Sequence, residues 1–263
     1  MESLQARVVG SGPPVVLLHG FGATQFTWRE VAPDLARTHE VHALDLLGCG
    51  ASPKPADGDY SPDHQARLVE AYITGRGLRD VTLMGHSFGG GVALLTALHL
   101  RQTPILRRLV LLDAPLYPQP LPLFIHVLRS PVGTLATRLV PTSWQVLHVL
   151  RRTYHEASTI APGVVDTYAA SLRQPGARPA LVATARTLVP DQVDTIVQQV
   201  RTLTLPVQIV WGRHDRIVPI STGERLSRDL PDARFAVIEA SGHAPQEERP
   251  AETLAVLRAF LAP

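Results

Sequence analysis

The residues most suggestive of chemistry form a short pattern around Ser87. Positions 85–89 read Gly-His-Ser-Phe-Gly, with an apolar run before them and a helix-forming run after them. A serine forced into such a strand-to-helix turn has a strained backbone, and its hydroxyl projects from the end of the sheet. Five-residue patterns of this kind also occur in ordinary turns. The flanking strand and helix favour Ser87 as a nucleophile.

Two later turns each follow an apolar run and present a titratable side chain. The first reads Gly-Arg-His-Asp at 212–215, and the second reads Gly-His at 242–243. A serine hydroxyl is a weak nucleophile unless a base takes its proton, and the base needs an acid that orients it. We therefore expect His243 to be the base and Asp215 its acid. Asp113, which ends an earlier apolar run, is the alternative acid.

Two further turns carry motifs of their own. Residues 19–22 read His-Gly-Phe-Gly, and residues 45–52 read Asp-x-x-Gly-x-Gly-x-Ser. Together with the chain order Ser, Asp, His, these motifs resemble the α/β-hydrolase superfamily, in the branch with a helical cap. The resemblance covers essentially the whole chain. It departs at Leu47 and Cys49, where relatives commonly have a proline and an aromatic residue, and neither position belongs to the expected triad.

The resemblance implies the fold and part of the site. The fold would be an α/β-hydrolase fold, with a mostly parallel central sheet, helices on both faces and a helical cap insertion. The backbone N–H groups of Phe21 and Phe88 would form the oxyanion hole that holds negative charge during attack on a carbonyl. His19 and His86 would support the site. Haloalkane dehalogenases and epoxide hydrolases are disfavoured, because relatives with those activities have aspartate where Ser87 stands.

Short apolar runs alternate with amphipathic segments along most of the chain, which is typical of a parallel sheet covered by helices. We expect strands over Ala6–Val9, Val15–Leu18, Val41–Asp45, Val81–Met84, Leu109–Leu112, Val207–Trp211 and Ala233–Ile238. We expect helices over Trp28–Ala36, Pro62–Gly75, Phe88–Leu100, Ser221–Asp229 and Ala251–Leu261. Ser61 followed by Pro62 is a typical helix start.

The alternation stops between about residues 115 and 190. Here the pattern is helical but interrupted by many prolines, which predicts several short helices set at angles. We therefore divide the chain into a core of residues 1–114 and 191–263 and a cap of residues 115–190. The resemblance implies that the cap folds over the nucleophile.

Aromatic and histidine side chains within the cap are the candidates for contact with substrate. The set comprises Phe124, His126, Trp144, His148 and Tyr154. The apolar stretch Leu121–Leu128 has two interpretations, a helix that buries one face against the core or an interfacial lid as in a lipase, and we favour the first.

Composition excludes several classes of protein. The apolar content of 45% supports a substantial core, and the net charge of +2 comes from scattered arginines, so we expect no nucleic-acid partner. One cysteine allows no internal disulfide, and the first residues show no secretory signal. We expect a cytoplasmic protein without membrane association. Without a Cys/His cluster or a nucleotide fingerprint, we expect neither a metal nor a cofactor.

These expectations combine into a cofactor-free serine hydrolase that cleaves carboxylic esters of small to medium size through an acyl-enzyme. The resemblance leaves other bonds open, because the same triad in relatives serves C–C (meta-cleavage-type) hydrolases, lactonases and perhydrolases. A ligand-binding receptor that retains the fold is the alternative from another class. Turnover of simple esters separates the enzyme from the receptor.

Overall fold

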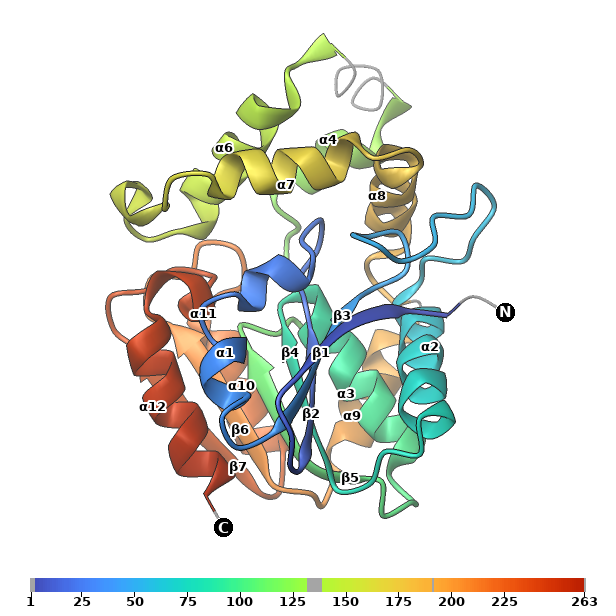
Figure 1. Cartoon of the computed structure of the whole chain (residues 1–263), viewed down its shortest axis with the longest axis vertical. Helices are drawn as coiled ribbons and strands as arrows, with labels where there is room; N and C mark the ends of the chain where they lie inside the picture. The colour runs from blue at the N-terminus through green and yellow to red at the C-terminus, as the bar shows by residue number, and fades with distance from the viewer. Residues whose placement is uncertain (1–2, 132–138, 191, 263) are drawn as a thin grey trace.

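The computed structural model describes residues 3–131, 139–190 and 192–262, and it contains a seven-stranded sheet with helices on both faces (Figure 1). The spatial order of the strands is β1-β3-β2-β4-β5-β6-β7. β1 runs antiparallel to β3, and all other neighbours are parallel, so the expected mostly parallel sheet is confirmed. The strands are β1 (Gln5–Val9), β2 (Pro14–Leu18), β3 (Glu40–Asp45), β4 (Val81–His86), β5 (Leu106–Leu112), β6 (Val207–Gly212) and β7 (Ala233–Ile238).

Both faces of the sheet are apolar because helices cover both. In β2, Val16 and Leu18 belong to one buried cluster, while Val15 and Leu17 belong to the other, as expected when alternate side chains point to opposite faces. The first cluster is covered by α2 (Pro62–Gly75), α3 (Phe88–Leu100), α9 (Val193–Val200) and α10 (Ile220–Asp229). The second is covered by α1 (Ala32–Leu35) and α12 (Pro250–Leu261).

Local capping chemistry explains where several helices begin. Ser61 accepts a hydrogen bond from the His64 N–H at 3.3 Å, and Pro62 occupies the first turn of α2, so the predicted bounds of that helix are confirmed. The predicted helix Trp28–Ala36 is wrong. The segment forms a 3₁₀ helix, η1 (Gln25–Trp28), followed by α1, because Pro33 is tolerated only in the first turn of a new helix.

The segment between β5 and β6 forms several short helices, as its prolines predict. We call residues 115–190 the inserted segment. It contains α4 (Leu123–Arg129), α6 (Thr142–Thr153), η2 (Ala157–Thr159), α7 (Val164–Arg173) and α8 (Ala177–Thr187). These helices, green to gold in Figure 1, lie together beyond one end of the sheet. The next helix, α9, packs on α3 and was not predicted.

A third buried cluster joins the inserted segment to the rest of the chain. Val146 and Leu150 of α6 pack with Tyr168 of α7, with Phe26 of η1 and with Ala244, which follows β7. No helix within the described residues is both long and apolar enough to span a bilayer.

Candidate active site

Ser87 lies on the tight turn between β4 and α3. Its φ of 52° is rare for a residue with a side chain, and its N–H is held by the carbonyl of Leu112 in β5 at 2.8 Å. A Cβ on Gly85 would lie 2.2 Å from the carbonyl oxygen of Gly89, and a Cβ on Gly89 would lie 2.4 Å from the carbonyl oxygen of His19, so both the strand and the helix need glycine here. The strained serine predicted from the sequence pattern is therefore present.

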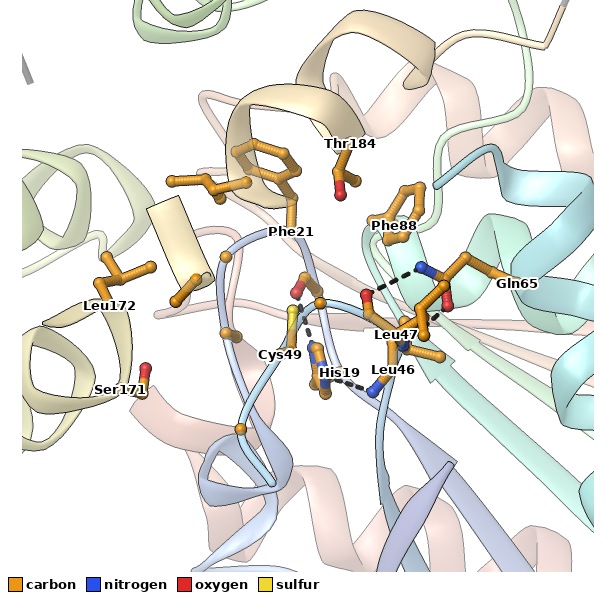
Figure 2. Close-up of a pocket in the computed structure, with 17 residues that line it drawn as sticks. His19, Phe21, Leu46, Leu47, Cys49, Gln65, Phe88, Ser171, Leu172 and Thr184 are labelled. Carbon is orange, nitrogen blue, oxygen red and sulfur yellow. Dashed lines mark hydrogen bonds between the residues drawn. The ribbon is translucent and has the colours of Figure 1, made fainter. Parts of the chain in front are cut away.

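A second turn lies against Ser87. A Cβ on Gly20 would stand 3.2 Å from the Cβ of Ser87, which places the Gly20–Phe21 peptide beside the hydroxyl group. His19 holds this turn, because its Nδ1–H donates to the carbonyl of Gly20 at 2.8 Å and its Nε2 accepts from the Leu46 N–H at 3.0 Å (Figure 2). Burial lowers the pKa of His19, so the ring is neutral as this pairing requires.

The N–H groups of Phe21 and Phe88 are available beside Ser87. Neither has a hydrogen-bond acceptor within the part of the chain that the structure describes. Phe88 is the first residue of α3, where backbone N–H groups carry the positive end of the helix dipole. Two free donors near a serine hydroxyl are what an oxyanion hole requires.

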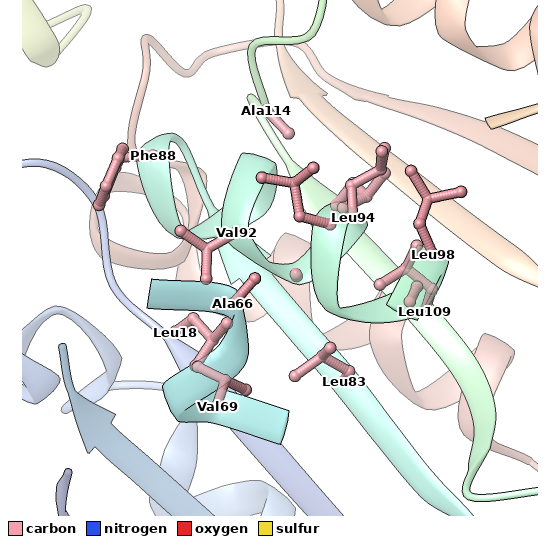
Figure 3. Close-up of a cluster of buried hydrophobic side chains, with 14 of the residues drawn as sticks. Leu18, Ala66, Val69, Leu83, Phe88, Val92, Leu94, Leu98, Leu109 and Ala114 are labelled. Carbon is pink, nitrogen blue, oxygen red and sulfur yellow. The ribbon is translucent and has the colours of Figure 1, made fainter. Parts of the chain in front are cut away.

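Helix α3 is fixed firmly beneath the serine. Figure 3 shows Val92, Leu94 and Leu98 among apolar side chains from α2 and from the strands. Val92 is fully buried, and a Cβ on Gly90 would lie 2.5 Å from the Cβ of Ala114. Because the helix cannot slide against the sheet, the position of Ser87 and of the first N–H groups is set by the core.

His243 bridges Ser87 and Asp215. Its Nδ1 lies 2.7 Å from Asp215 Oδ2, and its Nε2 lies 2.8 Å from Ser87 Oγ. A carboxylate only accepts hydrogen bonds, so Nδ1–H donates to Asp215 and Nε2 accepts from the serine hydroxyl. The side chain of His243 is 6% exposed, which limits competition from water. The structure thus brings together the three side chains singled out in the sequence.

The Asp215 carboxylate is oriented by its own turn. Oδ1 accepts from the N–H groups of Ile217 at 2.7 Å and Val218 at 3.0 Å, which leaves Oδ2 for His243. The Asp215 and His243 turns meet closely, because a Cβ on Gly212 would stand 1.7 Å from the Gly242 carbonyl oxygen.

Asp113 lies close to Asp215 and His243, but its carboxyl group accepts a hydrogen bond from a backbone N–H rather than from the His243 ring. It is fully buried, Oδ1 accepts from the Gly212 N–H at 2.9 Å, and Oδ2 has no partner within the described ranges. Burial, and next the charge of Asp215, raises the pKa of Asp113 well above its usual range. We infer that burial beside Asp215 favours the protonated form of Asp113, while the Asp215 carboxylate holds His243.

This inference predicts how stability depends on pH. A raised native pKa means that the folded protein keeps a proton that the unfolded chain releases above about pH 3.9, so stability falls as pH rises toward the native pKa. In Asp113→Asn, an amide oxygen still accepts from Gly212 and an amide N–H replaces the acid proton. The melting temperature of the variant should therefore fall less with rising pH than that of the wild type. Calorimetry across a pH series measures both slopes, and equal slopes would contradict a protonated Asp113.

Two further side chains position His243: Glu248, which the sequence analysis missed, and His86, which it expected to support the site. The Glu248 carboxylate accepts from the N–H groups of Gly242 and His155, at 2.8 and 2.7 Å, and so ties the His243 turn to the end of α6. His86 Nε2–H donates to the His243 carbonyl at 2.6 Å. Burial lowers the pKa of His86 to about 3, so its ring is a neutral support.

Glu247 accepts hydrogen bonds from both the inserted segment and the core. One oxygen accepts from Thr27 at 2.6 Å and Tyr168 at 2.8 Å, and the other accepts from Arg29 at 2.6 Å and Tyr154 at 3.0 Å. The cluster is buried and satisfied, which gives it a defined geometry. No local pattern joins these distant positions, so sequence reasoning had no signal for the cluster.

A cavity of about 760 Å³ lies between the inserted segment and the Ser87 turn. Ser87, Phe88 and His243 line it from the core, and Leu123, Phe124 and Trp144 are among the residues that line it from the inserted segment. A much smaller cavity of about 20 Å³ lies on the other side of Phe21, with room for about one water molecule (Figure 2).

The structure places three of the five predicted cap residues at the large cavity. Phe124, Trp144 and His148 line the large cavity, whereas His126 and Tyr154 do not. His126 is exposed because it lies about 100° around α4 from Ile125, whose side chain is buried. Tyr154 is buried because its hydroxyl points to Glu247.

Other candidate groups have structural partners. The Asp45 carboxylate accepts from the N–H groups of Gln25 and Ala51, at 2.8 and 2.9 Å, as a turn residue does. Burial raises the pKa of the Cys49 thiol to about 12, so it is not a reactive thiolate at neutral pH. Asp113, Asp215 and His243 place ligand atoms within 4.8 Å of one another. The 2.7 Å bond between Asp215 and His243 already occupies two of those atoms.

The comparisons with known proteins agree with this fold. The alpha/beta hydrolase fold family matches residues 13–250, and the chain belongs to that family. An uncharacterized protein of Mycobacterium tuberculosis is 30% identical, over 97% of this chain and 77% of that protein. A 2-hydroxymuconate semialdehyde hydrolase of a Pseudomonas species is 29% identical, over 96% of this chain and 88% of that enzyme. Among solved structures, an alpha/beta hydrolase fold protein of Burkholderia ambifaria aligns with a TM-score of 0.85 and 26% identity, over 99% and 94% of the two chains. The protein is therefore a hydrolase of this family.

Proposed function

We propose that the protein is a serine hydrolase that cleaves uncharged carboxylic esters through an acyl-enzyme. The observation that carries the proposal is the continuous chain of contacts from Asp215 through His243 to Ser87, at 2.7 and 2.8 Å. The free N–H groups of Phe21 and Phe88 support it, because they can hold the charge that develops on an ester carbonyl oxygen.

The first half of the reaction forms the acyl-enzyme. Ser87 Oγ attacks the carbonyl carbon while its proton passes to His243 Nε2, and the carbonyl oxygen becomes an anion between the two N–H groups. The bond to the alcohol then breaks, and the proton on Nε2 goes to the departing oxygen. Asp215 stabilises the imidazolium and keeps the ring in the orientation that both transfers need.

The second half returns the enzyme to its starting state. A water molecule gives a proton to His243 Nε2 and attacks the acyl carbon, the same N–H groups hold the oxyanion, and Ser87 leaves with the proton. The net change is one ester and one water converted to an acid and an alcohol. These two half-reactions use only Ser87, His243, Asp215, the N–H groups of Phe21 and Phe88, and water.

The lining of the large cavity supports an uncharged substrate. Its charged residues within the described ranges are Arg152, which is exposed, and Glu247, which is paired with Arg29. A carboxylate drawn deep into such a cavity would lose its hydration without gaining a counter-charge near Ser87. Apolar acyl groups meet no such cost.

A C–C bond hydrolase is the second candidate, because the Pseudomonas relative is named for a semialdehyde that such enzymes cleave. Its triad would serve the same steps on a carbon leaving group. An anionic dienoate would have to place its carboxylate near the mouth of the cavity, toward Arg152.

An ester series tests the choice of substrate class. We expect kcat/KM for p-nitrophenyl esters to rise from acetate by up to about fourfold per methylene, because each buried CH₂ contributes about 0.8 kcal/mol, and to fall once the acyl chain fills the cavity. Initial rates of p-nitrophenol release across the series, with Ser87→Ala as the blank, give kcat/KM as a function of acyl length. Negligible turnover of every ester, with rapid cleavage of a dienoic diketone, would show that the second candidate is right. A steady rise into long chains would instead indicate a lipase.

A further inference from the structure

The exposed apolar side chains of this protein gather on the inserted segment. Large apolar side chains that are exposed in the described residues are Val8, Leu123, Val127, Leu139, Val140, Trp144 and Val189. All but Val8 belong to the inserted segment, and Leu123, Leu139 and Trp144 are 70%, 78% and 74% exposed. Within the stretch Leu121–Leu128, Ile125 is buried as expected of a helix that packs with one face, but Leu123 and Val127 are open to solvent.

Five of these side chains also line the large cavity. They are Leu123 and Val127 of α4, Val140 just before α6, Trp144 in the first turn of α6, and Val189. We call these five residues and Leu139 the apolar rim. Exposed large apolar side chains that gather at one cavity mark a contact surface.

The charge of the same segment is strongly one-sided. Residues 115–190 contain seven arginines and two acidic residues, Glu156 and Asp166, so the segment carries +5 while the rest of the chain carries −3. No acidic residue occurs between Asp113 and Glu156. Arg129 at the end of α4 and Arg151 in the last turn of α6 are exposed, and neither has an acidic partner in the described part of the chain.

We propose that the apolar rim and its flanking arginines dock this protein on an anionic lipid surface. Exposed leucine, valine and tryptophan side chains next to arginines are the composition that binds the interface of a bilayer without crossing it. Tryptophan in particular is favoured at the boundary between headgroups and acyl chains. Each arginine near an anionic leaflet contributes attraction that a neutral lipid does not supply.

The proposal goes beyond the ester hydrolysis proposed above and revises the expectation of no membrane association. The cavity mouth would face the lipid, so apolar substrates that partition into the bilayer would meet the entrance directly. The chemistry at Ser87 is not changed by the docking. Binding can therefore be measured with no turnover at all.

Intrinsic fluorescence gives a direct readout. The chain has three tryptophans, and Trp28 and Trp211 are fully buried, so a response to vesicles reports on Trp144. Vesicles of phosphatidylcholine with an equal amount of phosphatidylglycerol should shift the emission to the blue and sediment with the protein. Vesicles of phosphatidylcholine alone should do so much less, and added salt should weaken the binding because it screens the charges.

Three variants and two matched controls locate the surface. Arg129→Glu and Arg151→Glu should each weaken partitioning at least about fivefold, since one cation contributes about 1 kcal/mol. Leu139→Ser should weaken it through lost apolar contact. Arg228→Glu, an exposed arginine on α10 with the same change in charge, and Val8→Ser, an exposed apolar residue on β1, should not. None of the three variant positions lines the cavity, so hydrolysis of a soluble ester should stay at the wild-type rate.

Several outcomes would overturn the proposal. One is equal binding to charged and neutral vesicles, and another is equal loss in the Arg129 and Arg228 variants. If the protein binds neither the charged nor the neutral vesicles, the proposal is also overturned. If the protein instead forms a concentration-dependent dimer that Leu139→Ser abolishes, the apolar rim is a contact between two copies. Failure of ester hydrolysis with intact vesicle binding would count against the proposed function and leave the docking surface standing.

Discussion

Replacement of Ser87 by alanine should abolish ester hydrolysis almost completely. Loss of the nucleophilic oxygen prevents the acyl-enzyme, and removal of the nucleophile of a serine protease costs roughly 10⁶-fold in kcat. Ser87→Ala keeps the Cβ, and alanine adopts a positive φ about as readily as serine does, so the turn at φ 52° is preserved. Rates with the best ester of the acyl series, over the uncatalysed background, measure the loss.

The control for this variant is its fold and its binding. The melting temperature of Ser87→Ala should match that of the wild type, and a non-hydrolysable ester analogue should bind with similar affinity. Ester hydrolysis within about tenfold of the wild type would mean that another group supplies the nucleophile.

Replacement of Asp215 by asparagine should lower kcat by up to about 10⁴, the size of loss seen when another serine hydrolase has its triad aspartate replaced by asparagine. The structure gives a specific reason. The N–H groups of Ile217 and Val218 need an acceptor at Oδ1, so the amide oxygen stays there and the amide NH₂ faces His243 Nδ1. Two donors cannot pair, so the ring is driven to the tautomer in which Nε2 carries the proton and cannot take one from Ser87.

Asp113→Asn is the matched control for this change. It removes a carboxyl group that lies within 4.8 Å of the Asp215 carboxylate and the His243 ring but does not hold that ring. Its kcat should stay within a fewfold of the wild type. Steady-state kinetics of the two variants decide the question. Collapse of kcat in Asp113→Asn with a nearly active Asp215→Asn would show that the acid belongs to the earlier strand.

Local patterns predict the parts of this site that depend on local backbone geometry. The Ser87 turn needs small residues on both sides, and its bounding strand and helix each have a clear apolar pattern. The strands with buried faces on both sides were found for the same reason. Their ends were predicted less well, since β5 begins at Leu106, three residues before the predicted Leu109, where side chains leave the core.

Contacts between distant segments could not be predicted in this way. The partners of Glu247 come from positions 27, 29, 154 and 168, and nothing in the residues around Glu247 points to them. Tyr154 was expected in the cavity because aromatic cap residues commonly face substrate. Its hydroxyl is instead needed to satisfy a buried carboxylate. The rotation of α4 about its own axis decides that His126 is exposed. That rotation depends on which face of α4 packs on α8.

Covalent labelling tests the central claim most directly. A fluorophosphonate reacts with a serine only where a base and an oxyanion hole activate it, and the adduct is stable enough to locate by peptide mass spectrometry. We expect a single adduct on Ser87 of the wild type, much slower labelling of Asp215→Asn, and none of Ser87→Ala. An adduct on any other serine, or an unmodified protein that still hydrolyses esters, would contradict Ser87 as the nucleophile.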